Sequence, residues 1–247
     1  MMKKVFIDNR GNKIAGVLHL PKDKTDKIVV MAHGFVSDKD RPRYIGIAQL
    51  LAENGFAALR FDFGGCGESY KSGITVRGWV EDLTSAINFV KEEGYSKIGL
   101  IGYSLGALIS LEVYNSIIKS ILLFAPVTKG ADRLQIILDE DKVSRADFEK
   151  QGYVIKTRRG REFKIEKEYF EERKAVNQKE LLSRVKCPVL IVHGNEDDSV
   201  PLSHSEKAMN YLSSDSELKI IQGADHHLEI IHGIDKMALD WFKRYLK

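Results

Sequence analysis

The chain has 247 residues, of which 43% are hydrophobic and 30% are charged, and its formal net charge at pH 7 is +3. This composition is ordinary for one soluble α/β domain with a sizeable core, and the near balance of charge gives no indication of a nucleic-acid partner. The sequence contains no apolar run of about 18 residues that would predict a membrane span, and no apolar stretch near the N-terminus that would predict a signal peptide. We therefore expect a cytoplasmic protein that binds neither nucleic acid nor membranes.

Strands and helices alternate along most of the chain, which predicts a mostly parallel sheet with helices on both faces. Alternating apolar residues on either side of 9–12 predict a β-hairpin at the start. The strands are expected near 4–8, 14–20, 28–33, 57–62, 97–102, 120–125, 188–193 and 217–222. The helices are expected at about 43–54, 76–92, 104–115 and 234–245, the last with one apolar stripe at helical spacing.

The alternation stops between 127 and 186, a stretch too long for a simple connection. Short helices are expected near 131–139 and 166–175. A hairpin is expected between them, with 153–157 facing 162–165 across a basic turn. The cations between Lys156 and Arg161 fit a solvated turn best, and attraction of an anionic substrate is the alternative.

The two cysteines, Cys66 and Cys187, predict no disulfide framework. Cys187 precedes a core strand, where buried thiols are inert packing residues. Cys66 lies in a glycine-rich loop at 64–67, which lacks the spacing and the following helix of a dinucleotide site.

Residues 98–106 read as a buried strand that ends in Gly102-Tyr103-Ser104-Leu105-Gly106 and continues into a helix. In a G-x-S-x-G turn of this kind the serine sits on a tight corner, and its hydroxyl stands clear of the sheet edge. The pentapeptide alone is a weak signal, because glycine and serine are common in turns. Its strand–turn–helix context makes Ser104 a candidate nucleophile.

A serine nucleophile needs a base and a carboxylate to orient that base. Two later strands are followed by such residues, in the order carboxylate then histidine. The first is followed by an acidic loop that contains Asp197, and the second by Asp225-His226-His227. The competing side chains are Glu196, Asp198 and Asp225 among the carboxylates and His227 among the histidines. Four further histidines offer no partner and are interpreted as structural or exposed, namely His19, His193, His204 and His232.

These segments resemble the serine-hydrolase branch of the α/β-hydrolase superfamily. Residues 193–201 are similar to its H-G-x-x-D-x-x-V-P segment and 223–226 to its G-A-x-H segment, which assigns the acid to Asp197 and the base to His226. The resemblance implies an α/β-hydrolase fold for 1–247 as a single domain, with a mostly parallel eight-stranded sheet. It also implies that 127–186 forms a cap inserted after the sixth strand.

Acyl transfer also needs donors for a tetrahedral oxyanion. The backbone N–H of Leu105, which follows the nucleophile, is one candidate. His33-Gly34-Phe35 resembles the superfamily's oxyanion turn, which makes the N–H of Phe35 the second donor and its ring part of the acyl pocket.

The sequence is most similar to the cinnamoyl/feruloyl esterase group, which implies a serine esterase that forms an acyl-enzyme on hydroxycinnamoyl or short-chain esters. Tyr169 is the candidate for binding the acyl group, and a tyrosine that only holds the cap down is equally compatible. The alternatives are a monoacylglycerol lipase-like esterase, a peptidase-like hydrolase and a ligand-binding protein without turnover. No metal or organic cofactor is expected, the partner is a small-molecule ester, and a homodimer is compatible with these expectations.

Overall fold

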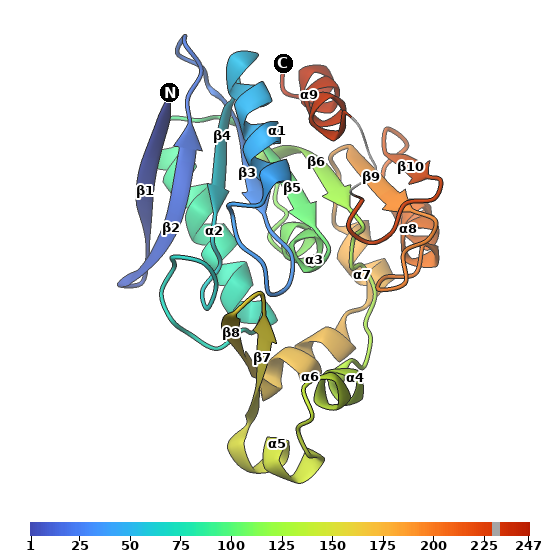
Figure 1. Ribbon diagram of the computed structural model, residues 1–247. Helices are drawn as coiled ribbons and strands as arrows, with labels where there is room; N and C mark the ends of the chain where they lie inside the picture. Colours follow the sequence, from blue (N-terminus) through green and yellow to red (C-terminus); the bar gives the residue numbers. More distant parts are fainter. Residues whose placement is uncertain (229–232) are drawn as a thin grey trace.

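Eight strands form one sheet in the computed structural model of the protein, which describes residues 1–228 and 233–247 (Figure 1). Across the sheet they are β1 (Met2–Asn9), β2 (Asn12–His19), β4 (Ala57–Phe61), β3 (Lys27–Ala32), β5 (Lys97–Tyr103), β6 (Ile118–Phe124), β9 (Val189–Gly194) and β10 (Glu217–Ile221). Both pairings of β2 are antiparallel, and the remaining strands run parallel. The predicted mostly parallel sheet is confirmed.

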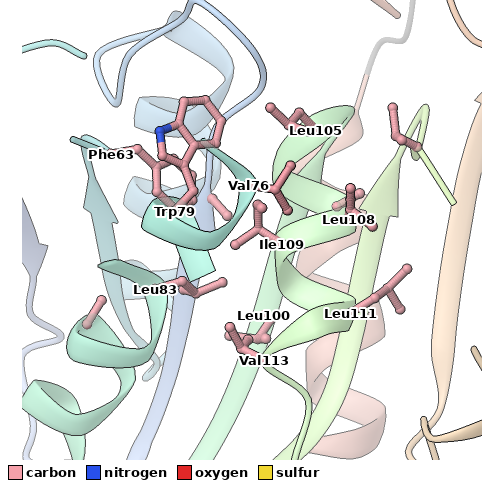
Figure 2. Close-up of a cluster of buried hydrophobic side chains, with 14 of the residues drawn as sticks. Phe63, Val76, Trp79, Leu83, Leu100, Leu105, Leu108, Ile109, Leu111 and Val113 are labelled. Atoms are coloured by element: carbon pink, nitrogen blue, oxygen red, sulfur yellow. The ribbon is translucent and has the colours of Figure 1, made fainter. Parts of the chain in front are cut away.

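The central strands are almost continuous apolar runs because helices cover both faces of the sheet. On one face lie α1 (Pro42–Glu53) and α9 (Ile234–Tyr245), and on the other lie α2 (Val76–Glu92) and α3 (Leu105–Glu112) (Figure 1). Figure 2 shows Ile109 of α3 on the side that faces α2, where Trp79 and Leu83 belong to the same buried cluster. This packing fixes α3, the helix that begins beside the candidate nucleophile.

The segment between β6 and β9 lies beyond the carboxyl ends of the parallel strands (Figure 1). It contains α4 (Leu134–Glu140), α5 (Arg145–Gln151), β7 (Tyr153–Arg158), β8 (Arg161–Glu166), α6 (Lys167–Ala175) and α7 (Gln178–Ser183). The predicted hairpin forms β7 and β8, and the two predicted helices correspond to α4 and α6. The sequence did not indicate α5 and α7, which are too short to show an apolar period and begin at the side-chain caps Ser144 and Asn177.

This cap segment contacts the sheet domain at the start of α2. The carboxylate of Glu172 on α6 accepts the backbone N–H groups of Val76, at 2.6 Å, and of Arg77, at 3.3 Å. A carboxylate is favourable there because the free N–H groups at a helix start carry partial positive charge. Ile165 of β8 also forms a backbone bridge with Ile74, just before α2. The last part of the chain adds α8 (Ser203–Ala208) and a single 3₁₀ turn, η1 (Met209–Tyr211).

Candidate active site

Ser104 stands on a strained corner between β5 and α3. Its backbone has φ 53° and ψ −112°, which is rare for a residue with a side chain. The corner needs glycine on both sides. A Cβ on Gly102 would lie 2.5 Å from Cα of Ala107, and one on Gly106 would lie 2.4 Å from the carbonyl oxygens of Ala32 and His33. The sequence context therefore produces the tight turn that it predicted.

The three residues expected to form the triad lie together. The Ser104 hydroxyl is 3.1 Å from Nε2 of His226, and Nδ1 of His226 is 2.7 Å from Oδ2 of Asp197. The carboxylate needs a proton donor at Nδ1, so Nε2 is left to accept the serine proton. The Asp197 side chain is fully buried, whereas His226 retains some contact with the cavity. A serine, a base and an orienting acid are thus linked by hydrogen bonds in the arrangement that nucleophilic catalysis requires.

Backbone and side-chain donors surround Asp197. Its Oδ1 accepts the N–H groups of Ser199, at 2.9 Å, and Val200, at 2.8 Å. Burial by itself would raise the pKa of Asp197, but the hydrogen bonds from His193, His226 and the Val200 N–H outweigh it and hold that pKa well below its usual range. Asp197 is therefore a permanent anion that orients His226.

His193 is the site residue that the sequence missed. It is fully buried, and its Nε2 faces two acceptors, Oδ2 of Asp197 and the carbonyl of Val200, each at 3.0 Å. Nε2 therefore carries a hydrogen, and Nδ1 lies 2.6 Å from the Ser205 hydroxyl, which can donate to it. The expectation that His193 offers no partner is wrong. Its position four residues before Asp197, at the end of a buried strand, was the available signal.

The competing histidine and carboxylates have other contacts. The Tyr103 hydroxyl lies 3.4 Å from Nδ1 of His227 and donates to the carbonyl of His226 at 2.5 Å. Asp225 accepts the backbone N–H groups of His227 and Leu228, at 2.9 and 3.0 Å, and so forms the turn that presents His226. Glu196 and Asp198 are exposed. Of the remaining histidines, His232 lies outside the described residues.

The turn expected to supply the oxyanion donor is held from behind by His33. Nε2 of this buried ring accepts the N–H of Phe63 at 3.1 Å, so Nδ1 carries the hydrogen that points at the Gly34 carbonyl 2.8 Å away. Burial lowers the pKa of His33, which keeps the ring neutral. In a trans peptide the C=O and the N–H point in opposite directions. Holding the Gly34 carbonyl therefore turns the N–H of Phe35 away from His33.

The backbone of this turn is strained next to the Phe35 N–H. Val36 has φ 46°, a left-handed conformation that is unusual for a β-branched residue. Among residues 1–228 and 233–247, no protein acceptor receives the backbone N–H of Phe35 or that of Leu105. Both residues border the same cavity as Ser104. Two backbone donors are therefore available for an anion beside the serine.

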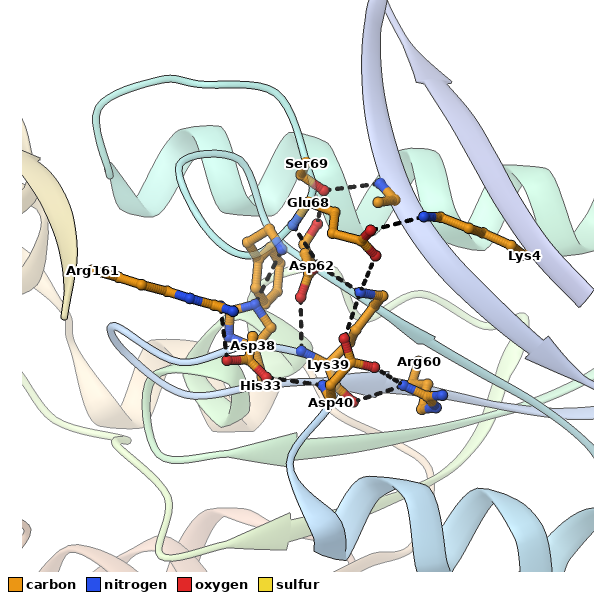
Figure 3. Close-up of polar contacts among 12 residues, drawn as sticks. Lys4, His33, Asp38, Lys39, Asp40, Arg60, Asp62, Glu68, Ser69 and Arg161 are labelled. Carbon is orange, nitrogen blue, oxygen red and sulfur yellow. Dashed lines mark hydrogen bonds and ion pairs between the residues drawn. The ribbon is translucent and has the colours of Figure 1, made fainter. Parts of the chain in front are cut away.

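An ionic cluster centred on the buried Lys39 and Asp62 holds the segment after Phe35 in place (Figure 3). The Lys39 ammonium, only 1% exposed, contacts Asp40 at 2.8 Å, Asp62 at 3.0 Å and Glu68 at 2.8 Å. Desolvation opposes its charge, but these carboxylates outweigh desolvation and raise the pKa of Lys39. Asp38 of the same segment pairs with Arg161 of the cap at 3.2 Å. The oxyanion turn and the cap are thus connected by an ion pair.

A cavity of about 800 Å³ lies between the sheet edge and the cap, and Ser104 and His226 open into it. The rings of Phe35 and Tyr169 stack in its wall, with centroids 5.0 Å apart and planes inclined by 12°. Tyr169 of α6 is buried, so it packs the cap down and borders the cavity at the same time. The expectation of a fully solvated basic turn is wrong in part, because Lys156, Arg158 and Arg159 also line this cavity.

The described residues offer no cluster of three or more histidine, cysteine, aspartate or glutamate side chains that could hold a metal ion. Both cysteines are buried, and burial raises the pKa of Cys187 to about 12. No helix in the part of the chain that the structure describes has the length and apolar character needed to cross a bilayer.

Comparisons with known proteins agree with this fold. The family model described as Serine aminopeptidase, S33 matches residues 23–183, more than half of the chain. An acyl transferase of Shewanella hanedai is 28% identical over 227 residues, which cover 85% of this chain and 71% of that protein. The mitochondrial palmitoyl-protein thioesterase ABHD10 of Bos taurus is 24% identical over 208 residues, or 81% of this chain and 67% of that one.

Among solved structures, Est1E from Butyrivibrio proteoclasticus with bound ferulic acid has a TM-score of 0.78 at 21% identity, covering 98% of both chains. The esterase domain of a Rhodothermus marinus protein has a TM-score of 0.76 at 24% identity, covering 100% of both. At such identities these likenesses show the fold alone. The chain belongs to the family described as Serine aminopeptidase, S33, and is a hydrolase with the α/β-hydrolase fold.

Proposed function

We propose that this protein is a serine esterase that cleaves carboxylic esters through an acyl-enzyme. The observation that carries the proposal is the chain of hydrogen bonds from Ser104 through His226 to Asp197. Beside the serine lie two backbone N–H groups that have no acceptor among residues 1–228 and 233–247. A serine linked in this way needs no metal ion to become a nucleophile.

In the proposed reaction, Oγ of Ser104 attacks the ester carbonyl carbon while Nε2 of His226 takes the hydroxyl proton. The carbonyl oxygen becomes an oxyanion and receives hydrogen bonds from the N–H groups of Phe35 and Leu105, each worth about 2.7–4 kcal/mol in such sites. The tetrahedral intermediate collapses, His226 gives its proton to the departing alcohol, and the acyl group stays on Ser104. Water then attacks the acyl-enzyme with His226 as base, releasing the acid and restoring the serine.

For the acyl group we propose a hydroxycinnamoyl (feruloyl-type) or short-chain acid. The stacked rings of Phe35 and Tyr169 in the cavity wall support a flat aromatic acyl group, and the similarly folded Est1E has been solved with ferulic acid. A monoacylglycerol lipase-like activity is disfavoured by the charged cavity wall, because a long alkyl chain needs an apolar tunnel. The family's description keeps peptide hydrolysis as an alternative for the same serine.

The experiment that tests the proposal compares kcat/KM for methyl ferulate, 4-nitrophenyl butyrate and a leucine 4-nitroanilide. Each substrate is assayed with the wild type, Ser104→Ala and the control Ser116→Ala, which changes an exposed serine outside the cavity. Loss of ester cleavage on the order of 10⁴–10⁶ in Ser104→Ala alone is the expected result. Cleavage of the anilide alone would replace the esterase by a peptidase, and esterase activity that survives in Ser104→Ala would refute the nucleophile.

Tyr169→Phe tests the acyl pocket, since it keeps the ring stacked on Phe35 and removes only the hydroxyl. A role in binding the phenolic end predicts weaker cleavage of methyl ferulate than of the butyrate ester. Equal effects on both esters would leave Tyr169 as a packing residue of the cap.

A further inference from the structure

The wall of the catalytic cavity is rich in arginine side chains that have no acidic partner among the described residues. Six arginines line it and form no ion pair with any residue of 1–228 or 233–247, namely Arg41, Arg43, Arg133, Arg158, Arg159 and Arg173. The two carboxylates in the same wall are already neutralised, Asp132 by Lys174 at 3.1 Å and Glu140 by Lys156 at 2.8 Å. The formal net charge of the whole chain is only +3, so the arginine-rich wall differs from the near balance of charge in the sequence.

Among these six arginines, Arg173 gives the strongest evidence for a bound anion. This residue is only 4% exposed. Among the described residues, its guanidinium contacts only uncharged oxygen atoms: the Lys129 carbonyl, at a long 3.4 Å from Nη1, and the Tyr169 hydroxyl. A guanidinium stays protonated even when buried, and a buried charge is costly unless an anion or a set of hydrogen bonds compensates it. Arg173 has five N–H donors, so the two acceptors found among the described residues leave part of its donor capacity for a ligand.

The position of Arg173 places its N–H donors beside the cavity that receives the substrate. Arg173 follows Tyr169 by four residues on α6, so both side chains lie on the same helix face, and both border the cavity. His204, on α8, borders the cavity beside them, and its buried Nδ1 has no hydrogen-bond partner in the described structure. The helices α6 and α8 thus place a buried guanidinium and a buried imidazole beside the same cavity.

We infer that the cavity takes an ester whose acyl or alcohol part carries a carboxylate or phosphate group, and that Arg173 binds this anionic group. This inference rests on the proposed esterase and specifies its substrate class. The planar fork of arginine fits either oxyanion group with two parallel hydrogen bonds. The half-exposed Arg158 and exposed Arg159 at the hairpin tip draw such a substrate toward the cavity mouth.

Matched substrates separate the two sources of the anionic group. Monomethyl adipate against methyl hexanoate places a carboxylate on the acyl side, and 1-hexanoylglycerol 3-phosphate against 1-hexanoylglycerol places a phosphate on the alcohol side. We expect the wild type to prefer the anionic member of one pair by about 10- to 100-fold in kcat/KM. A preference for the neutral member in both pairs would overturn the inference without any variant.

Arg173→Met then identifies the residue, with Arg145→Met as its control. Arg145 is also a cap arginine, but it is exposed, paired with Glu149 and outside the cavity. The anionic-to-neutral ratio should fall about tenfold or more in Arg173→Met, recover in part in Arg173→Lys, and stay at the wild-type value in Arg145→Met. An unchanged anionic-to-neutral ratio in a folded Arg173→Met would show that Arg173 only connects α6 with the Lys129 carbonyl and does not bind the substrate.

A binding measurement keeps this inference apart from the proposed chemistry. Calorimetric titration of Ser104→Ala with monomethyl adipate and with glycerol 3-phosphate needs no turnover. Saturable binding that weakens in Ser104→Ala/Arg173→Met supports the anion site even if no ester is cleaved. If that double variant does not fold, Arg158→Gln/Arg159→Gln takes its place, and weaker binding there supports the same conclusion. Turnover of neutral esters without any binding of either anion would leave the esterase intact and refute the anion site.

Discussion

Nε2 of His193 lies 3.0 Å from Oδ2 of Asp197, the same carboxylate oxygen that receives Nδ1 of the candidate base. His193 is fully buried and its other nitrogen is held by Ser205, so the ring cannot turn away from the acid. A second donor on this oxygen fixes the carboxylate plane and shares its negative charge. His193 is therefore a positioning residue that acts through Asp197.

Removing that donor changes the rate and the pH profile together. In His193→Leu we expect kcat to fall about tenfold or more with a smaller change in KM, the cost of a lost hydrogen bond to a charged group. Asp197, with one donor fewer, attracts the proton of His226 more strongly, so the acid side of the kcat profile should move to higher pH. The measurement is kcat between pH 4 and 9 (about one value per half unit).

His193→Gln is the matched variant because its amide retains an N–H donor, and it should recover part of kcat and of the profile. A lower kcat with an unmoved profile in His193→Leu would show that His193 serves only the packing of β9.

The buried ammonium of Lys39 offers a test of the segment behind the oxyanion turn. Lys39→Met leaves the fully buried Asp62 without its cationic partner, which should cost about 3–5 kcal/mol of the free energy of unfolding. Lys4→Met removes an exposed partner of Glu68 and should cost less than about 1 kcal/mol. Urea denaturation of the three proteins measures both values, and similar losses in the two variants would contradict the distinction between buried and exposed pairs.

Two glycine-to-alanine changes should have opposite signs. Gly106→Ala drives a methyl group against the carbonyl oxygens of Ala32 and His33, so we expect destabilisation by more than about 2 kcal/mol. Gly46 lies inside α1, and a methyl group added there would meet no atom within 4 Å, so Gly46→Ala should stabilise by about 0.5–1 kcal/mol. Thermal unfolding measures both changes in stability. A Gly106→Ala variant as stable as the wild type would mean that the turn between β5 and α3 can open to make room for the methyl group.

His19 makes the free energy of unfolding depend on pH. Burial, followed by the charges of Arg60 and the N-terminal amine, lowers the pKa of His19 from 6.5 to about 4. Between these values the unfolded chain binds a proton that the folded chain does not, so the free energy of unfolding falls as the pH falls through this window. Below about pH 4 both states are protonated, and this contribution becomes constant.

His19→Gln removes this titration, while its amide oxygen can still accept the hydrogen bond from Arg60. Urea denaturation at pH 7 and pH 4 should show that the variant loses about 3 kcal/mol less between the two pH values than the wild type does. Parallel losses in the two proteins would show that His19 is protonated in the fold near its ordinary pKa.

The sequence by itself determined the sheet and the order of the candidate site residues. The buried strands are short apolar runs, and the corner at Ser104 follows from two flanking glycines. Both can therefore be predicted from a few neighbouring residues. The segments that carry Asp197 and His226 follow such strands, and the carboxyl ends of parallel strands meet at one edge.

Only the tertiary structure decided which groups face one another there. His193 reads as an ordinary strand residue until the loops after β9 and β10 bring Asp197 and His226 together beside it. The six arginines of the cavity come from segments that span 41–173, and their lack of an acidic partner among the described residues depends on where the folded chain places its carboxylates. Periodicity reports which side of an element is buried, whereas charge compensation in a cavity is a property of side chains that meet only after folding.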